Sequence, residues 1–141
     1  MTILDRYLAY ADAFEVSFKD DDWSHIEPYF TEDAVYEGEP EDAHGRDAVF
    51  AKLKQSLDTF DRNMDSRTLE FDTPTVDGDT LRVKWSGTYT KAGAPDLVIS
   101  GVEIATFEGD RIARLSGEFD PEAQKAMGKW MAAHAALLQG D

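Results

Sequence analysis

The sequence contains no cysteine and no long apolar run. Without cysteine, the chain has no disulfide framework, no thiolate metal site and no cysteine nucleophile. No apolar stretch approaches the roughly 20 residues that span a bilayer. The N-terminal segment also carries an acidic residue, Asp5, where a signal peptide would carry only basic ones. We therefore expect a cytoplasmic protein.

Basic residues are scarce as well. The 141 residues include 14 Lys and Arg against 29 Asp and Glu, which gives a formal net charge of −15. Nucleic acid and anionic membranes repel such a surface, so neither is expected as a partner. The excess acid is typical of a soluble or salt-adapted protein rather than of a functional acidic patch. Apolar residues make up 42% of the chain, which favours a folded core over disorder.

The predicted elements come in the order helices, strands, helix, which favours an α+β fold over alternating βαβ units. The length fits a single domain over residues 1–141. A capping box at Thr2 and Asp5 predicts the start of the first helix. We expect helices over 3–19 and 47–60, a short helix near 23–30, strands over 34–37, 66–75, 79–91, 97–107 and 111–119, and a last helix after Asp120-Pro121.

The strand over 79–91 alternates apolar and polar residues, which predicts one buried and one exposed face, with the odd-numbered positions inward. Three-residue turns at 76–78 and 108–110 would pair Leu69 with Trp85 and Glu103 with Leu115. In this register Gly87, Gly101 and Gly117 form one inward row. Three adjacent glycines would let the sheet bend and would leave a hollow above it.

The outer face of the strand over 97–107 carries three aliphatic side chains, Val98, Val102 and Ile104. On a monomer these side chains would face water. We therefore expect a second copy of the sheet to cover them in a two-fold homodimer.

Three motifs resemble the nuclear transport factor 2-like superfamily, and most closely its SnoaL-like polyketide cyclases and ketosteroid isomerases. They are Trp23-x-x-Ile26-x-x-x-Phe30-x-x-Asp33-Ala34-Val35-Tyr36, Gly45-Arg46-Asp47-Ala48-Val49 and Phe107-Glu108-Gly109-Asp110-Arg111-Ile112. The resemblance implies a cone-like curved antiparallel sheet wrapped on N-terminal helices, with an extra C-terminal helix. Because such motifs describe packing and turns, they are specific for the fold and uninformative about activity.

Carrying the resemblance over residue by residue gives a mixed result. It implies that Tyr7 matches the isomerases' helix-one tyrosine and that Glu103 stands where they keep a protonated acid. Their general base would fall at Gly38, and the acid of the cyclases at about Gly117. Neither glycine can act as an acid or a base, so the mechanism does not transfer directly.

Glu103 is the most informative residue, because it is the one carboxylate on an inward, otherwise apolar strand face. An unpaired ionised carboxylate there would cost several kcal/mol, so the group must be either paired or protonated. Two interpretations stay open. Glu103 is a catalytic acid or base, or it forms a salt bridge with Arg67, one predicted row away.

If catalysis occurs, we expect either His44, in a loop near the rim, or a water molecule to move the proton. No His, Asp or Glu spacing is typical of a metal site, and no glycine pattern is typical of a nucleotide cofactor, so neither is expected. The side chains expected to line a ligand pocket are Phe14, Tyr36, Arg67, Trp85, Tyr89, Leu115 and Phe119.

Three functional hypotheses follow. The first is a cofactor-free isomerase, cyclase or dehydratase that moves a proton on an apolar carbonyl compound, with Glu103 and Tyr7 polarising the substrate oxygen. The second is a module that binds a small apolar ligand without reaction. The third is a dimeric assembly module whose pocket has no role.

Overall fold

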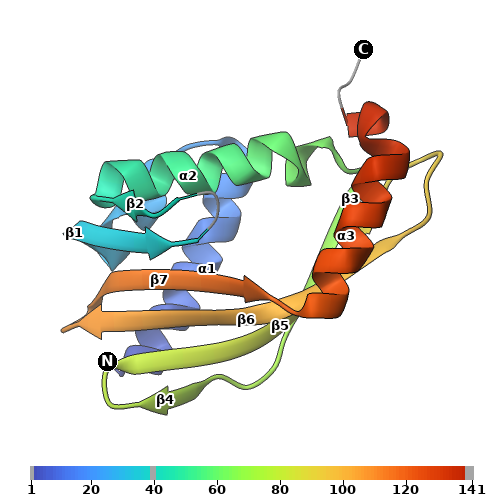
Figure 1. Cartoon of the computed structure of the whole chain (residues 1–141). Helices are drawn as coiled ribbons and strands as arrows, with labels where there is room; N and C mark the ends of the chain where they lie inside the picture. Colours follow the sequence, from blue (N-terminus) through green and yellow to red (C-terminus); the bar gives the residue numbers. More distant parts are fainter. Residues whose placement is uncertain (1, 39–40, 139–141) are drawn as a thin grey trace.

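The structure, a computed structural model, describes residues 2–38 and 41–138. Its elements are α1 (Ile3–Asp20), η1 (Trp23–Tyr29), β1 (Phe30–Glu37), β2 (Ala43–His44), α2 (Arg46–Thr59), η2 (Asp61–Asn63), β3 (Ser66–Phe71), β4 (Thr75–Asp77), β5 (Thr80–Thr90), β6 (Leu97–Glu108), β7 (Arg111–Phe119), α3 (Pro121–His134) and η3 (Ala135–Leu138). Figure 1 shows α1 and α2 against the sheet, and α3 at the end of the sheet away from β1. The predicted α+β class and element order are confirmed.

The sheet is mixed rather than fully antiparallel. Its strand order is β2-β1-β7-β6-β5-β3, and β4 also pairs with β5. All pairs are antiparallel except β1 with β7, which run parallel. No hairpin turn joins β1 to β7, so turn chemistry could not indicate their relative direction.

Helix α1 begins as predicted, and two tyrosines lie on its buried side. The Thr2–Asp5 capping box is present. The buried residues are Tyr7, Tyr10 and Ser17, whereas Leu8 is 48% exposed despite its apolar side chain. Adjacent helical residues point about 100° apart, so a helix that buries Tyr7 and Tyr10 turns Leu8 aside. The ring of Tyr10 packs edge-on against Phe30 at 5.4 Å between centroids.

The predicted strand registers are wrong by two residues. Leu69 pairs with Gly87, and Glu103 pairs with Gly117. The β4–β5 hairpin closes with Asp77 opposite Thr80, so its turn has two residues, and residues 72–74 separate β3 from β4. The β6–β7 hairpin likewise has a two-residue turn followed by a register shift. Because both registers are shifted by an even number of residues, the predicted inward and outward faces of the strands are correct.

The three inward glycines lie on a diagonal instead of in one row. Gly87 pairs with Ile99, Gly101 with Trp85 and Gly117 with Glu103, so each is one row further along the sheet. Neighbouring groups fill the space above them. A Cβ on Gly101 would clash with the backbone oxygen of Glu118. The glycines therefore permit close packing and a bent sheet, not the continuous hollow that we expected.

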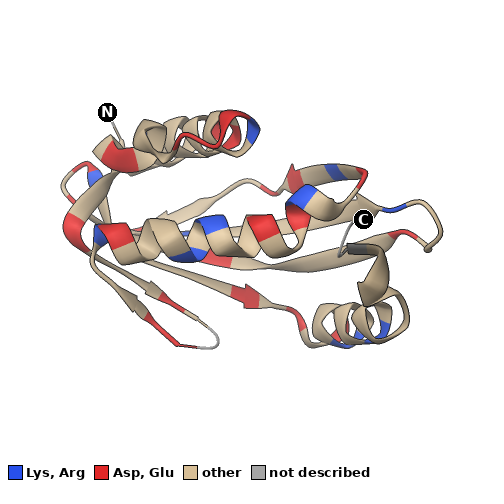
Figure 2. Cartoon of the chain, turned by 90° about the horizontal axis from the view of Figure 1, so that it is seen from above, with Lys and Arg blue, Asp and Glu red and all other residues tan. Residues whose placement is uncertain are grey.

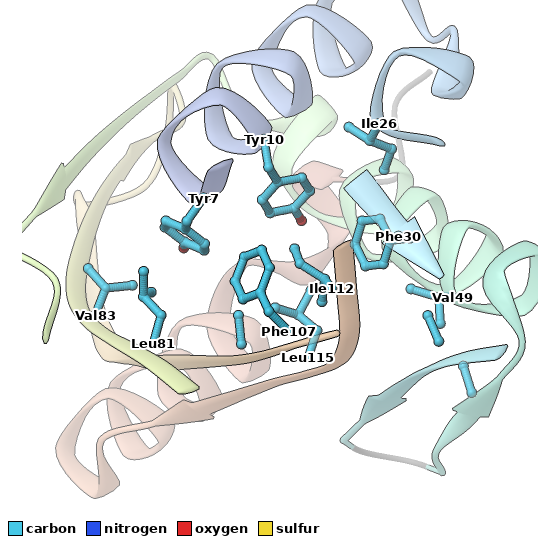
Figure 3. Packing of buried hydrophobic residues seen from close by; sticks show 13 residues of the cluster. Tyr7, Tyr10, Ile26, Phe30, Val49, Leu81, Val83, Phe107, Ile112 and Leu115 are labelled. Atoms are coloured by element: carbon cyan, nitrogen blue, oxygen red, sulfur yellow. The ribbon is translucent and has the colours of Figure 1, made fainter. Parts of the chain in front are cut away.

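Two hydrophobic cores hold the fold together. The larger joins α1, η1 and β1 to the β5–β7 end of the sheet and includes Tyr7, Tyr10, Phe30, Leu81 and Leu115. Figure 3 shows its side chains converging between α1 and the strands. The smaller core lies under α3 and consists of Phe60, Met64, Tyr89, Leu97, Ile99, Ala123 and Trp130. Between the two cores, the inner face of the sheet carries side chains that belong to neither.

Candidate functional site

Glu103 lies on the inner face of β6, where α1 crosses the sheet. Its strand neighbours are Val83 on β5 and Gly117 on β7. From α1, the hydroxyl of Tyr7 donates a hydrogen bond to Oε2 of Glu103. Tyr7 is 3% exposed and belongs to the larger core. The packing of α1 therefore fixes the donor, and the alternation of β6 points the carboxylate toward it.

The surroundings of Glu103 disfavour negative charge. Burial raises the pKa of the Glu103 carboxyl, and the hydrogen bond from Tyr7 only partly offsets this. Although the residue as a whole is half-buried, its carboxyl group lies at the deep end of the side chain, and that is the part that titrates. Burial, reinforced by the Glu103 charge, also raises the pKa of the Tyr7 and Tyr10 hydroxyls.

A third tyrosine faces the same carboxyl from β1. Tyr36 pairs with Leu115 of β7, so its side chain points inward. Burial, followed by the charge of Glu103, raises the pKa of Tyr36 to about 12. Three protonated phenols around one carboxyl that resists ionisation form a site suited to proton transfer and to binding an oxygen atom. The structure thus brings together Glu103, Tyr7 and Tyr36 of the predicted residues, and adds Tyr10.

Arg67 does not pair with Glu103, so the salt-bridge interpretation is wrong. Its guanidinium contacts Glu15 at 3.0 Å and Asp61 at 2.7 Å. On β3 it is opposite Tyr89, two rows beyond the row that contains Trp85. Burial alone would lower the Arg67 pKa, but Glu15 and Asp61 outweigh it and leave the pKa raised. At Asp61 the effect of burial exceeds that of Arg67, and the pKa of the carboxyl is raised. The attraction to Arg67 therefore offsets only part of the cost of burying the Asp61 charge.

His44 is likewise separated from Glu103. It lies in the short strand β2, opposite Val35, and is exposed, whereas its neighbour Ala43 is buried. Side chains alternate along a strand, so the burial of Ala43 directs His44 outward. The loop that we expected here is a two-residue strand, and its register excludes the predicted catalytic position.

The residues expected to line a pocket divide into two groups. Leu115, Phe14 and Tyr89 are core residues. Leu115 is fully buried, Phe14 packs against Tyr10 and Trp23, and Tyr89 packs against Phe60 in the smaller core. By contrast, Trp85 and Phe119 retain exposed surface, and their rings meet edge-on at 5.8 Å between centroids.

An exposed aromatic row lies next to Glu103. Phe71, Trp85, Gly101 and Phe119 pair across four strands, one row from the row of Glu103. Phe71 is 52% exposed and Phe119 42%, and neither belongs to a core. Successive inward rows are about 6.7 Å apart, so a ligand of one or two rings spans the distance. Phe71 was not predicted to line the site, although its odd-numbered position on β3, opposite Trp85, directs it inward.

Two hollows of the molecule lie elsewhere. One, of about 290 Å³, includes Lys84, Ser86 and Ser100 of the outer sheet face. The other, of about 470 Å³, lies beside Phe18, Arg62 and Arg67. Neither is lined by Glu103 or Tyr7. The candidate site is thus a packed polar cluster beside an exposed aromatic row, and not the open hollow that we expected over the glycines.

Residues 2–38 and 41–138 contain neither a metal-binding cluster nor a membrane-spanning helix. Within these ranges no three His, Asp or Glu side chains are grouped to hold a metal ion. No described helix is long and apolar enough to cross a membrane. Figure 2 shows acidic residues distributed over helices, strands and loops rather than gathered at one place.

Solved structures share this fold. A nuclear transport factor 2-like protein of unknown function from Exiguobacterium sp. 255-15 is 20% identical over 85% of this chain and 99% of its own, with a TM-score of 0.64. TerC, co-crystallised with polyporic acid, is 15% identical over 90% and 98%, with a TM-score of 0.66. A candidate polyketide cyclase from Sinorhizobium meliloti is 22% identical over 77% and 93%, with a TM-score of 0.55.

At these identities, likeness to solved structures establishes the fold alone. No significant match is found among curated proteins. The profile of the SnoaL-like domain, however, matches residues 8–115, which is most of the chain and includes nearly all of α1, Glu103 and most of the sheet. The chain therefore belongs to the SnoaL-like family of the nuclear transport factor 2-like fold.

Proposed function

We propose that the chain is a cofactor-independent enzyme that transfers a proton on a small apolar carbonyl compound. The observation that carries this proposal is the buried Glu103 carboxyl, which accepts a hydrogen bond from Tyr7 and whose pKa burial raises. A carboxyl group that binds a proton more tightly than usual is a stronger base once ionised, and it also remains available as a proton donor nearer to neutral pH.

The two residues have different roles. The Tyr7 hydroxyl has one proton and donates it to Glu103, so it holds the carboxylate in position and stabilises its charge. Glu103 then removes a proton from a carbon beside the carbonyl group and returns it to another position. This assignment uses both predicted residues but makes Glu103, rather than His44, the proton carrier.

The exposed aromatic row supplies a binding surface for the apolar part of the substrate. Phe71, Trp85 and Phe119 lie one row from Glu103 on the same face of the sheet. Aromatic faces bind flat apolar molecules well. Two structural neighbours are consistent with this class of ligand, one being a candidate polyketide cyclase and the other a protein co-crystallised with polyporic acid.

We also propose that the chain forms a two-fold homodimer through the outer face of the sheet. Val98 is 57% exposed on this face, and Val102 and Ile104 extend the stripe along β6. Lys84 pairs with Val102 from β5, and Glu118 pairs with it from β7. A two-fold axis along β6 places β5 of one copy over β7 of the other, so that these opposite charges meet.

Proton transfer can be tested without knowing the natural substrate. We expect the chain to accelerate exchange of the α-protons of apolar cyclic ketones, such as 1-tetralone and 2-decalone, in deuterated water, followed by NMR. Glu103→Gln should slow the exchange by about 100-fold or more, the usual contribution of general acid–base catalysis. Glu32→Gln, which removes an exposed carboxylate from β1, is the matched control and should exchange at the wild-type rate.

The alternative of a non-catalytic binding module predicts a different result. If the ketones shift the NMR signals of Tyr7 and Tyr36 but exchange is not accelerated, the site binds without reaction. If exchange is accelerated equally by wild type and Glu103→Gln, the assignment of Glu103 is wrong.

A further inference from the structure

Tyr36 occupies a space that two glycines leave open. Gly38 follows Tyr36 by two positions, directly after the end of β1, and a Cβ on Gly38 would lie 3.0 Å from Cε1 of the Tyr36 ring. Across the sheet, a Cβ on Gly117 would lie 3.2 Å from the Tyr36 hydroxyl. Both distances are tighter than ordinary van der Waals contact, so a side chain at either glycine would displace the ring or the hydroxyl.

The position of the hydroxyl places it beside Glu103. Gly117 pairs directly with Glu103 across β6 and β7, and the Cβ positions of such a pair are about 5 Å apart. Because the Tyr36 hydroxyl stands over Gly117, it lies next to the Glu103 side chain on the inner face.

The hydroxyl of Tyr36 is also uncommitted. Among the described residues it has no hydrogen-bond partner, whereas the Tyr7 hydroxyl donates to Glu103. The ring is held in place by the Lys52 ammonium group, which lies 5.7 Å from its centroid. Lys52 is in turn anchored, because it donates to the backbone oxygen of Glu41 at 2.6 Å. The Tyr7 donor is therefore occupied, and the Tyr36 donor is available to a ligand.

We propose that Tyr36 donates the hydrogen bond that binds the substrate oxygen, opposite the Glu103 carboxylate, and that Gly38 and Gly117 are glycines because Tyr36 fills the space of their side chains. This inference rests on the proposed function. Glu103 takes a proton from the carbon beside the carbonyl group. The electron pair of the broken C–H bond forms a carbon–carbon double bond, and the carbonyl π pair moves to the oxygen.

The developing negative charge is then stabilised by the Tyr36 O–H group, which keeps its proton because its pKa is raised to about 12. Glu103 returns its proton to carbon and the carbonyl group is restored, so no other reactant is needed. The substrate class is thus an enolisable ketone whose oxygen reaches β1 while its apolar part lies toward Trp85.

The test measures binding of 2-naphthol, whose naphtholate form resembles an enolate, by fluorescence titration at fixed pH. Loss of one hydrogen bond to a charged oxygen weakens binding by roughly tenfold or more, and we expect this from Tyr36→Phe. Gly117→Ala should weaken binding to a similar extent, because its Cβ displaces the hydroxyl. When Gly117→Ala is added to Tyr36→Phe, it should have no further effect. Tyr29→Phe is the matched control, since Tyr29 lies in η1 with its ring against the Arg6 guanidinium and is not one of the phenols around Glu103.

Each outcome decides between the two proposals. If Tyr36→Phe binds as tightly as Tyr29→Phe while Glu103→Gln changes the affinity, the role of Tyr36 is wrong and the Glu103 site stands. If the effects of Gly117→Ala and Tyr36→Phe add up in the double variant, the role of Tyr36 is also overturned. If wild type does not bind 2-naphthol, the proposed function fails and this inference fails with it.

Discussion

Replacing Glu103 by Gln should stabilise the protein at neutral pH while it removes activity. Two opposing free-energy contributions decide whether the variant is more or less stable than wild type. The hydrogen bond from Tyr7 loses its charge assistance, which costs about 1 kcal/mol. In return the folded state no longer holds a carboxylate whose pKa burial raises, and removing such a penalty is worth several kcal/mol. We expect a net gain of about 1–3 kcal/mol at pH 8, or a rise in Tm of roughly 3–10 °C for a domain of this size.

The pH dependence follows from the direction of the shift. A carboxyl group whose folded pKa lies above its unfolded pKa binds more protons in the folded state. Its contribution to stability is therefore complete below the unfolded pKa and is lost as the pH rises through the folded pKa. The advantage of Glu103→Gln over wild type should consequently be largest at pH 8–9 and should shrink toward pH 5.

Urea unfolding of wild type, Glu103→Gln and Glu32→Gln at several pH values measures these differences directly. Glu32 is exposed on β1, so its substitution should change stability by less than about 0.5 kcal/mol. If Glu103→Gln is instead destabilised by 2 kcal/mol or more, about equally at every pH, then Glu103 is a structural partner. In that case the argument for a strained acid–base group is wrong.

Two further predictions concern other parts of the molecule. Arg67→Ala should lower the free energy of unfolding by about 3 kcal/mol at pH 7, because it leaves the half-buried Asp61 without its cation. In urea unfolding, this loss of stability should shrink as the pH falls and Asp61 is protonated. A loss that does not depend on pH would contradict this reasoning. Ile104→Lys should convert a dimer into a monomer by light scattering, since it places a charge in the proposed interface; a wild type that is already monomeric excludes that interface.

The inward position of Glu103 was predictable from the sequence because it depends only on parity. Odd-numbered residues of β5 and β6 face the core, and a slip of two residues leaves this unchanged. Which residues become neighbours depends on the register itself. The register was wrong because the turns at Gly78 and Gly109 are two-residue turns and because residues 72–74 leave the ladder. The hydrophobic periodicity of the sequence does not indicate such local irregularities.

The partners of Arg67 and the orientation of His44 were not predictable for a related reason. Arg67 contacts Glu15 of α1 and Asp61 of η2, and its choice depends on how these helices cross the sheet. The position of His44 depends on the pairing of β2 with β1. With two residues, β2 is too short to show an alternating pattern in the sequence. In both cases tertiary packing, rather than local propensity, decides where the charged group lies.

The packing around Tyr36 also bears on the two positions, 38 and 117, where glycine replaces the acids expected from the resemblance. From the resemblance, glycine at positions 38 and 117 counted against chemistry, because neither can carry a proton. In the structure both glycines adjoin Tyr36, one at its ring and one at its hydroxyl. An acid at position 117 would take the space of that hydroxyl beside Glu103, so an acid there and Tyr36 in its present position exclude each other. The absence of carboxylates at both positions thus leaves room for a phenol beside Glu103, which is the arrangement that the proposed mechanism needs if Glu103 is to remove the proton while Tyr36 binds the oxygen.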